Sequence, residues 1–196
     1  MNRNKLKYLT FATLTMFSQF AAAHTGVTVN YDLFHGLQHV VFGLDHILAM
    51  LGLGMWASSQ SDFIAKRGVV TVGLFILLGA LLGWMGVAFV YLELSVILSV
   101  LAVGIVLSLG VDKCPRLIVL TTIAVFASIH GLTHGHEMPA TTSVLGYILG
   151  IVLASLLLYL GGWLIGLFSQ QKKLNGLTRF YGALVGITGA WLLLMS

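Results

Sequence analysis

Phe34-His35-Gly36-Leu37-Gln38-His39-Val40-Val41-Phe42-Gly43-Leu44-Asp45-His46-Ile47-Leu48-Ala49-Met50 is an apolar stretch near the N-terminus that is interrupted by histidines and an aspartate. The stretch is expected to form one helix, in which, at about 100° per residue, one stripe collects the polar side chains and the apolar ones cover most of the rest. An ionisable side chain at membrane depth costs roughly 2.5 kcal/mol or more to insert. Such a stripe therefore predicts a functional face, made of His35, Gln38, His39, Asp45, His46 and Met50.

The composition of the whole chain is that of an integral membrane protein. Of its 196 residues 58% are hydrophobic and only 8% are charged, against roughly 25% charged in soluble domains. The formal net charge of +4 comes largely from Arg3, Lys5 and Lys7 near the N-terminus. No basic patch with interleaved aromatic residues is present, so the sequence gives no support for nucleic-acid binding.

The N-terminal segment resembles a secretory signal peptide. It has a basic start, an apolar part over about 8–20, and three alanines at 21–23 that would suit cleavage. We therefore expect a signal peptide over 1–23 and a mature domain over 24–196 that begins at His24. An uncleaved first membrane helix is the alternative, although its apolar part is short for a ~30 Å hydrocarbon core.

The remaining chain predicts an all-α, polytopic fold with six transmembrane helices in one domain. Each apolar segment is near the ~20 residues that cross a bilayer. The expected spans are 33–56, 69–90, 92–110, 117–137, 142–168 and 178–196. Pairs of glycines four residues apart, such as Gly79/Gly83 and Gly162/Gly166, predict close helix packing.

The basic residues predict the orientation of these spans. Every Lys and Arg after residue 23 falls on alternate connections between them: Lys66, Arg67, Lys113, Arg116, Lys172, Lys173 and Arg179. By the positive-inside rule these connections are cytoplasmic, so the mature N- and C-termini are expected in the periplasm. At 1.5 Å per residue, Asp45 and His46 would then lie ~18–20 Å along a continuous first helix, near the bilayer midplane.

A second polar cluster ends the fourth expected span, with the sequence Ile129-His130-Gly131-Leu132-Thr133-His134-Gly135-His136-Glu137-Met138-Pro139. The pattern His-Gly-Leu-x-His occurs both here and at 35–39. If the helix continues, His130, His134 and Glu137 share one face. No single helical face can surround a metal ion, so we expect the fourth span to pack against the first.

Imidazole and carboxylate groups together suit divalent transition metals such as nickel, cobalt, zinc and copper. The expected metal ligands are His39, Asp45, His46, His130, His134 and Glu137. The secondary candidates are His24, His35 and His136. Asp45 is expected to be the critical carboxylate, because its charge would partly neutralise a dication where desolvation is worst.

The two clusters resemble the HupE/UreJ family of membrane proteins. The first-helix motif His-x5-Asp-His followed by Leu-Ala-Met is matched by His39, Asp45, His46 and 48–50, and the later His-Gly-x-x-His-Gly-x-Glu pattern by 130–137. Val40 departs from the family, which commonly has Pro after the first His. The resemblance implies supply of nickel or cobalt to hydrogenase, urease or cobalamin pathways, without choosing between the two metals.

These observations predict a secondary permease or facilitator, and not an enzyme, that imports a divalent metal across the bacterial inner membrane. Nickel is the first candidate for this metal and cobalt is the second. Nickel or cobalt would be the transported substrate, with membrane lipid around the protein and no organic cofactor. The prediction is compatible with a homo-oligomer and with contact to a hydrogenase, urease or cobalamin maturation machinery. A haem-binding redox protein that uses histidines of the two helices is the alternative. An intramembrane metallohydrolase is a third class, although no His-Glu-x-x-His pattern occurs.

Overall fold

The computed structural model describes residues 29–196. The predicted signal peptide over 1–23 and His24 lie outside the described residues. Within 29–196 the chain is helical and contains no strand. The helices are α2 (Val29–Phe42), α3 (Leu44–Ser58), α4 (Asp62–Trp84), α5 (Leu92–Leu109), α6 (Arg116–His136), α7 (Val144–Gln171) and α8 (Asn175–Met195).

Five of these helices, α4 to α8, are long and apolar enough to cross a membrane. The pair α2 and α3 together passes the same test but is bent by 80°. The chain is therefore a multi-pass membrane protein, and the expectation of six spans holds only if the bent pair is counted as one. Large apolar side chains cover the outer surfaces of α4 to α8, as lipid-facing helices require.

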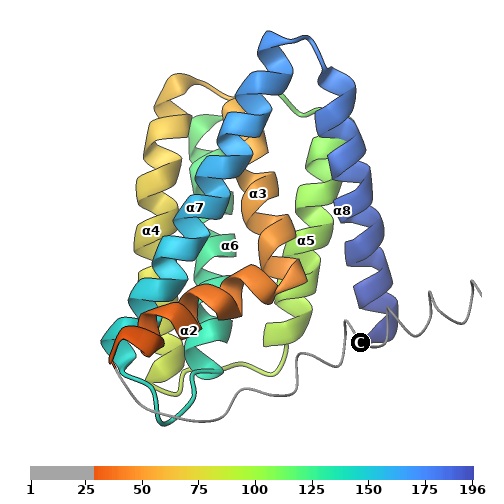
Figure 1. Ribbon diagram of the computed structural model, residues 1–196. Coiled ribbons are helices and arrows are strands. Elements are labelled where there is room, and N and C mark those ends of the chain that lie inside the picture. Colours follow the sequence, from red (N-terminus) through yellow and green to blue (C-terminus); the bar gives the residue numbers. More distant parts are fainter. Residues whose placement is uncertain (1–28) are drawn as a thin grey trace, which may run out of the picture.

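The expected continuous helix over 33–56 is wrong, because the helix breaks at Gly43. Gly43 has an extended backbone, with φ −77° and ψ 106°, and glycine is a poor helix former. In consequence α2 lies across one end of the bundle, and α3 runs into it (Figure 1). The expected single polar stripe is therefore wrong, because it needs a continuous helix. His46 does not lie ~18–20 Å along such a helix either, since it is in the first turn of α3.

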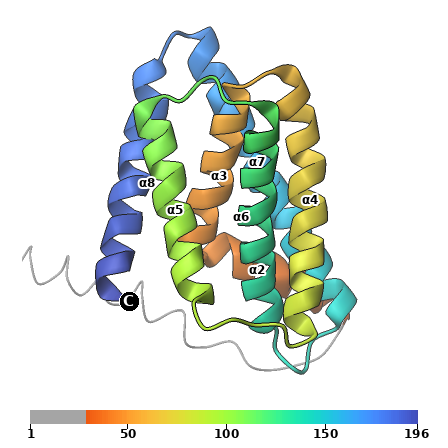
Figure 2. The ribbon, with the colours of Figure 1, turned by 180° about the vertical axis from the view of Figure 1, so that it is seen from behind.

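The helix α3 is the centre of the bundle. Figure 1 shows α7 and α2 in front of it, and Figure 2 shows α5 and α6 on the opposite side. Ala49, Met50, Leu53 and Ala57 of α3 are completely buried. Because lipid surrounds the outer helices, a short inner helix of this kind is held by close packing more than by a hydrophobic driving force.

Glycines allow the neighbouring helices to approach closely, as their spacing predicts. A Cβ on Gly162 would clash with the backbone of Leu51, and one on Gly36 with the carbonyl oxygen of Tyr147. Small residues at such crossings are typical of membrane helix packing. At the chain reversals after α4 and α5, Gly86 (φ 87°) and Gly110 (φ 66°) adopt positive φ values, which glycine does without steric cost.

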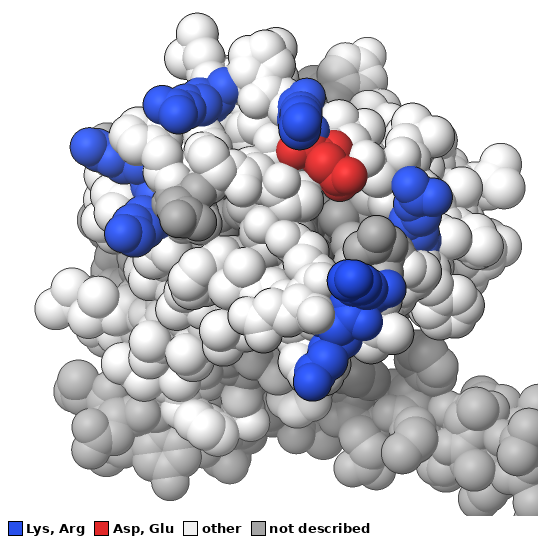
Figure 3. All heavy atoms as spheres, turned by 90° about the horizontal axis from the view of Figure 1, so that it is seen from above, with Lys and Arg blue, Asp and Glu red and all other residues white. Residues whose placement is uncertain are grey.

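The two ends of the bundle differ in charge. The described Lys and Arg side chains lie at the end opposite α2, where a space-filling view along the bundle shows much basic and little acidic surface (Figure 3). The chain enters α2 and leaves α8 at the other end (Figure 1). Asp32, Asp45, Glu93 and Glu137 belong to helix termini at that end.

Candidate metal centre

The candidate centre lies at the α2 end of the bundle, where the ends of three helices meet. α2 supplies His39 in its last turn, the first turn of α3 supplies His46, and the last turns of α6 supply His130 and His134. Glu137 follows directly as the C-cap of α6. The side chains of the two predicted clusters therefore do meet, although His39 and Glu137 are 98 residues apart in the sequence.

The outermost group consists of His39, His134 and Glu137. His39 Nε2 donates to Glu137 Oε2 at 3.1 Å, and His134 Nδ1 lies 3.7 Å from the same oxygen. One donor atom from each of the three residues falls within 4.8 Å of the others. His39 and Glu137 are partly open, with 37% and 47% of their side chains exposed, whereas His134 is buried. A cation could reach these three donors from the surface.

A chain of buried imidazoles continues inward from His134. His134 Nε2 and His46 Nδ1 are 2.8 Å apart, and the rings of His46 and His130 pack edge to face with centroids 4.8 Å apart. Both His46 and His130 are buried, at 0% and 1% exposure. Buried polar rings must be hydrogen-bonded to be tolerated, and two serines meet this need. Ser155 Oγ of α7 lies 2.9 Å from His46 Nε2, and Ser99 Oγ of α5 lies 2.9 Å from His130 Nε2.

The carboxylate of Glu137 is stabilised by its neighbours. When the imidazoles of His134 and His39 beside it are protonated, they lower the pKa of Glu137 from 4.5 to about 2, against the opposing effect of partial burial. The side chain is therefore ionised throughout the neutral and mildly acidic range. A negative group held among imidazoles is a suitable oxygen ligand for a divalent transition metal.

The structure places the other predicted ligands differently. Asp45 is half-buried and close enough to His130 to interact with it electrostatically, but it is not part of the group formed by His39, His134 and Glu137. His35 and His136 are exposed and lie outside that group too. The expectation that α6 packs against the first helix also needs correction. The backbone of α6 packs chiefly against α4, and α6 reaches α2 and α3 through its histidine and glutamate side chains.

The glycines of the repeated His-Gly pattern explain this geometry. A Cβ on Gly131 or Gly135 would clash with the backbone carbonyl of Ile76 or Ala80 in α4. Each glycine therefore lets α6 lie directly against α4, while the histidine before it, about 100° away around the helix, points toward α3. In the first copy, Gly36 packs in the same way against α7.

Ser99, Ser155 and Tyr147 contribute to the centre but were not among the residues predicted from the sequence. The ring of Tyr147 lies 5.9 Å from that of His39, and its buried hydroxyl has no hydrogen-bond partner among the described residues. The only signal in the sequence was that each serine interrupts a strongly apolar helix. Which helix such a serine faces is a tertiary property that periodicity does not give.

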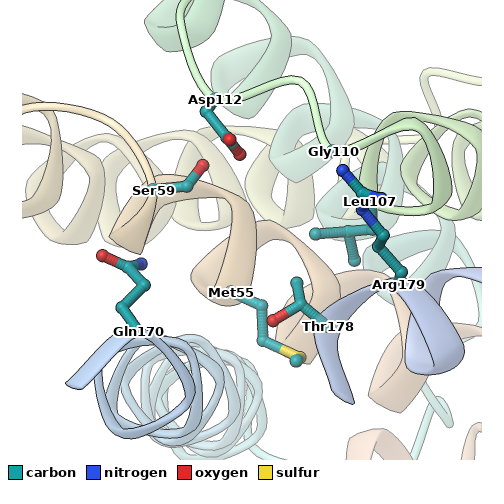
Figure 4. A pocket seen from close by; sticks show the side chains of 8 residues that line it. All are labelled: Met55, Ser59, Leu107, Gly110, Asp112, Gln170, Thr178 and Arg179. Carbon is teal, nitrogen blue, oxygen red and sulfur yellow. The ribbon is translucent and has the colours of Figure 1, made fainter. Parts of the chain in front are cut away.

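A polar cavity of about 220 Å³ lies at the opposite end of the bundle. Asp112, Ser59, Met55 and Thr178 are among its lining residues, with Gln170 and Arg179 on opposite sides (Figure 4). None of the histidines in residues 29–196 lines it. Between this cavity and the imidazole chain lies a layer of buried apolar side chains, which includes Met50, Leu53, Val100 and Val103.

A model of the family described as HupE / UreJ protein matches residues 12–192. The chain belongs to the HupE/UreJ family. It is also 33% identical over 189 residues to Protein HupE of Rhizobium leguminosarum bv. viciae, an alignment that covers 94% of this chain and 95% of that protein. No solved structure matches the chain. Family membership confirms the resemblance drawn from the two histidine motifs.

Proposed function

We propose that this HupE/UreJ protein is a secondary permease or facilitator that imports a divalent transition metal, nickel or else cobalt, through the bacterial inner membrane. One observation carries the proposal: His39, His134 and Glu137 form a partly open donor group that continues into the buried imidazoles of His46 and His130. Such a series of nitrogen and oxygen donors, leading from the surface into the bundle, suits passage of an ion better than a closed structural site.

In the proposed first step, Glu137, His39 and His134 capture the ion. The ion would take the place of the proton through which His39 Nε2 binds Glu137 Oε2, and this proton would be released to solvent or move to Nδ1, because a metal binds the deprotonated nitrogen of imidazole. The nitrogens of His134 and His46 that face each other, 2.8 Å apart, would provide the next donors inward once the proton between them is released. Asp45 would lend its negative charge near His130, where a dication is least solvated.

The charge asymmetry of the bundle supports the direction of import. The Lys/Arg end would face the cytoplasm by the positive-inside rule, so the α2 end and the imidazoles would face the periplasm. An inward-negative potential supplies ~2.3 kcal/mol per charge per 100 mV, hence about 4.6 kcal/mol for a divalent ion. The buried apolar layer on the cytoplasmic side of the imidazoles would have to open during passage, which fits alternating access.

The geometry favours an ion over a haem group. The rings of His46 and His134 are hydrogen-bonded, and their centroids are 4.7 Å apart. If two of these histidines ligated a haem iron, their rings would have to move apart by the thickness of the porphyrin. An apolar cavity beside the rings would also be needed to hold the porphyrin. Neither the cavity at the Lys/Arg end nor the one among Leu53, Trp56 and Phe126 is lined by a described histidine.

Uptake of radiolabelled nickel and cobalt by cells tests the proposal. Cells that express the protein should accumulate one of the two metals at nanomolar concentration faster than cells without it. Zinc, copper, manganese and magnesium added in turn as unlabelled competitors would define selectivity. Equal uptake of both labels with and without the protein, at verified protein levels in the membrane, would refute the proposed function.

A further inference from the structure

Two buried serines make the same hydrogen-bonding arrangement around the imidazoles. Ser155 in α7 is completely buried, and its hydroxyl donates to the carbonyl oxygen of Ile151 at 2.8 Å. Ser99 in α5 is 1% exposed and donates to the carbonyl oxygen of Val96 at 2.7 Å. A serine hydroxyl has one proton, and when that proton goes to the carbonyl, the oxygen is left as an acceptor for the histidine that faces it.

The direction of this bond fixes the tautomer of His46. Because Ser155 Oγ accepts, the proton of neutral His46 resides on Nε2, and its Nδ1 carries a lone pair. His46 Nδ1 must then accept from His134 Nε2, which lies 2.8 Å away. Neutral His134 in turn has its proton on Nε2 and a lone pair on Nδ1.

This lone pair is in an unusual position. His134 Nδ1 is buried, has no hydrogen-bond partner among the described residues, and lies 3.7 Å from Glu137 Oε2. A buried acceptor without a partner costs free energy, and here a second acceptor, with a negative charge, faces it. Two such acceptors are mutually repulsive unless a cation or a proton lies between them.

We infer that Ser155 is a positioning residue for the proposed metal site: through His46 it holds His134 in the tautomer whose Nδ1 lone pair can bind a divalent cation together with Glu137. The inference deepens the proposed function and rests on it for the identity of the cation as nickel or cobalt. The relay Ser155–His46–His134 is a property of the protein before any metal binds. Ser99 holds His130 in the equivalent Nε2-protonated form.

The tautomers can be measured directly by ¹⁵N nuclear magnetic resonance of metal-free protein labelled at its histidines and reconstituted in lipid. His134 is identified by the signal lost in His134→Gln. We expect an unprotonated Nδ1 and a protonated Nε2 for both His134 and His46 near neutral pH. A protonated Nδ1 on His134 would overturn the inference, because the relay would then run in the opposite direction, from Ser155 outward.

Metal uptake provides the second test, with two variants of equal shape. Ser155→Thr keeps a hydroxyl that can donate to the carbonyl four residues earlier, and Ser155→Val has the same volume without it. Partners that orient metal-binding histidines typically contribute 10–100-fold in metal affinity. We expect the metal concentration for half-maximal uptake to be ~10–100-fold higher in Ser155→Val than in Ser155→Thr, with a smaller change in maximal rate per molecule of protein.

The control is Ser128→Ala. Ser128 in α6 also donates to the carbonyl of its own helix, Ala124 O at 2.8 Å, but binds none of the described histidines, so uptake should be unchanged. Equal half-saturation in Ser155→Val and Ser155→Thr would overturn the role of Ser155 while leaving the permease proposal intact. Absence of nickel and cobalt uptake in the wild type, together with an unprotonated His134 Nδ1, would instead refute the permease and retain the relay.

Discussion

The α2 end of the bundle and the Lys/Arg end are built from opposite chemistry around one central helix. At the α2 end α3 presents His46 to three other histidines and Glu137. At the other end it finishes beside a polar cavity with Asp112 and Arg179 in its lining and Lys and Arg around it. A dication is attracted by the first environment and repelled by the second. The difference suits capture at one end and release at the other.

Opposite exposure of the two ends would be seen by cysteine labelling in a Cys114→Ser background. A cysteine at Thr141, in the exposed loop before α7, should react completely with a membrane-impermeant reagent added outside. A cysteine at Lys172, at the Lys/Arg end, should react only after permeabilisation. Reversed labelling would invert the orientation, and capture and release would then exchange sides.

Two histidines of α6 offer the sharpest test of the imidazole chain. His134 is buried between His39 and His46, whereas His136 is exposed. We expect His134→Ala to reduce nickel or cobalt uptake by roughly 100-fold or more, because it removes one donor from the outer group and interrupts the chain. His136→Ala should change uptake by less than about twofold. Similar losses in both variants would mean that the buried chain is not the pathway.

The two carboxylates at the α2 end should have separate effects. Asp45→Asn removes a negative charge near His130 without changing side-chain shape, and we expect it to reduce maximal uptake nearly to background at a normal protein level. Glu137→Gln removes the outer carboxylate and should chiefly raise the half-saturating concentration, by ~10-fold or more. Normal uptake by Asp45→Asn would exclude Asp45 from the route past His130.

Glycine substitutions should give the smallest effects, and they would act on stability. Gly131→Ala adds a Cβ that meets the carbonyl of Ile76, so the α4–α6 crossing must widen. Overpacking of this kind typically costs 1–3 kcal/mol, which we expect to lower the melting temperature of the purified protein. Gly176→Ala, whose Cβ would meet nothing within 4 Å, is the matched control and should be neutral or slightly stabilising. Unchanged stability in Gly131→Ala would contradict the close contact between α4 and α6 at this glycine.

The sequence predicted the helical membrane fold and most of the residues that the structure brings together at the α2 end. Hydropathy found the membrane helices, and the spacing of His130 and His134 correctly predicted that both face the same buried side of α6, with Glu137 next to His134. Charge on alternate connections separated the two ends correctly. Hydropathy placed the start of α4 at 69 rather than Asp62, because Lys66 and Arg67 in its first turns are not apolar.

The remaining features depend on three-dimensional packing. A periodicity analysis assumes a continuous helix, and the break at Gly43 therefore rotated Asp45 and His46 away from the stripe expected with His35 and His39. The hydrogen bonds from His46 to Ser155 and from His130 to Ser99 join different helices. Neither serine belongs to a motif, and each looks in the sequence like any small polar residue of a membrane helix.

The central claim is that this HupE/UreJ protein conducts a divalent metal ion through its imidazole chain. Purified protein in proteoliposomes, oriented and loaded with a metal-sensitive dye, measures this directly under an imposed potassium diffusion potential. We predict nickel or cobalt entry that accelerates as the interior becomes more negative and that is lost in His134→Ala but kept in His136→Ala. Entry equal to that of empty liposomes, or equal entry in wild type and His134→Ala, would contradict the account.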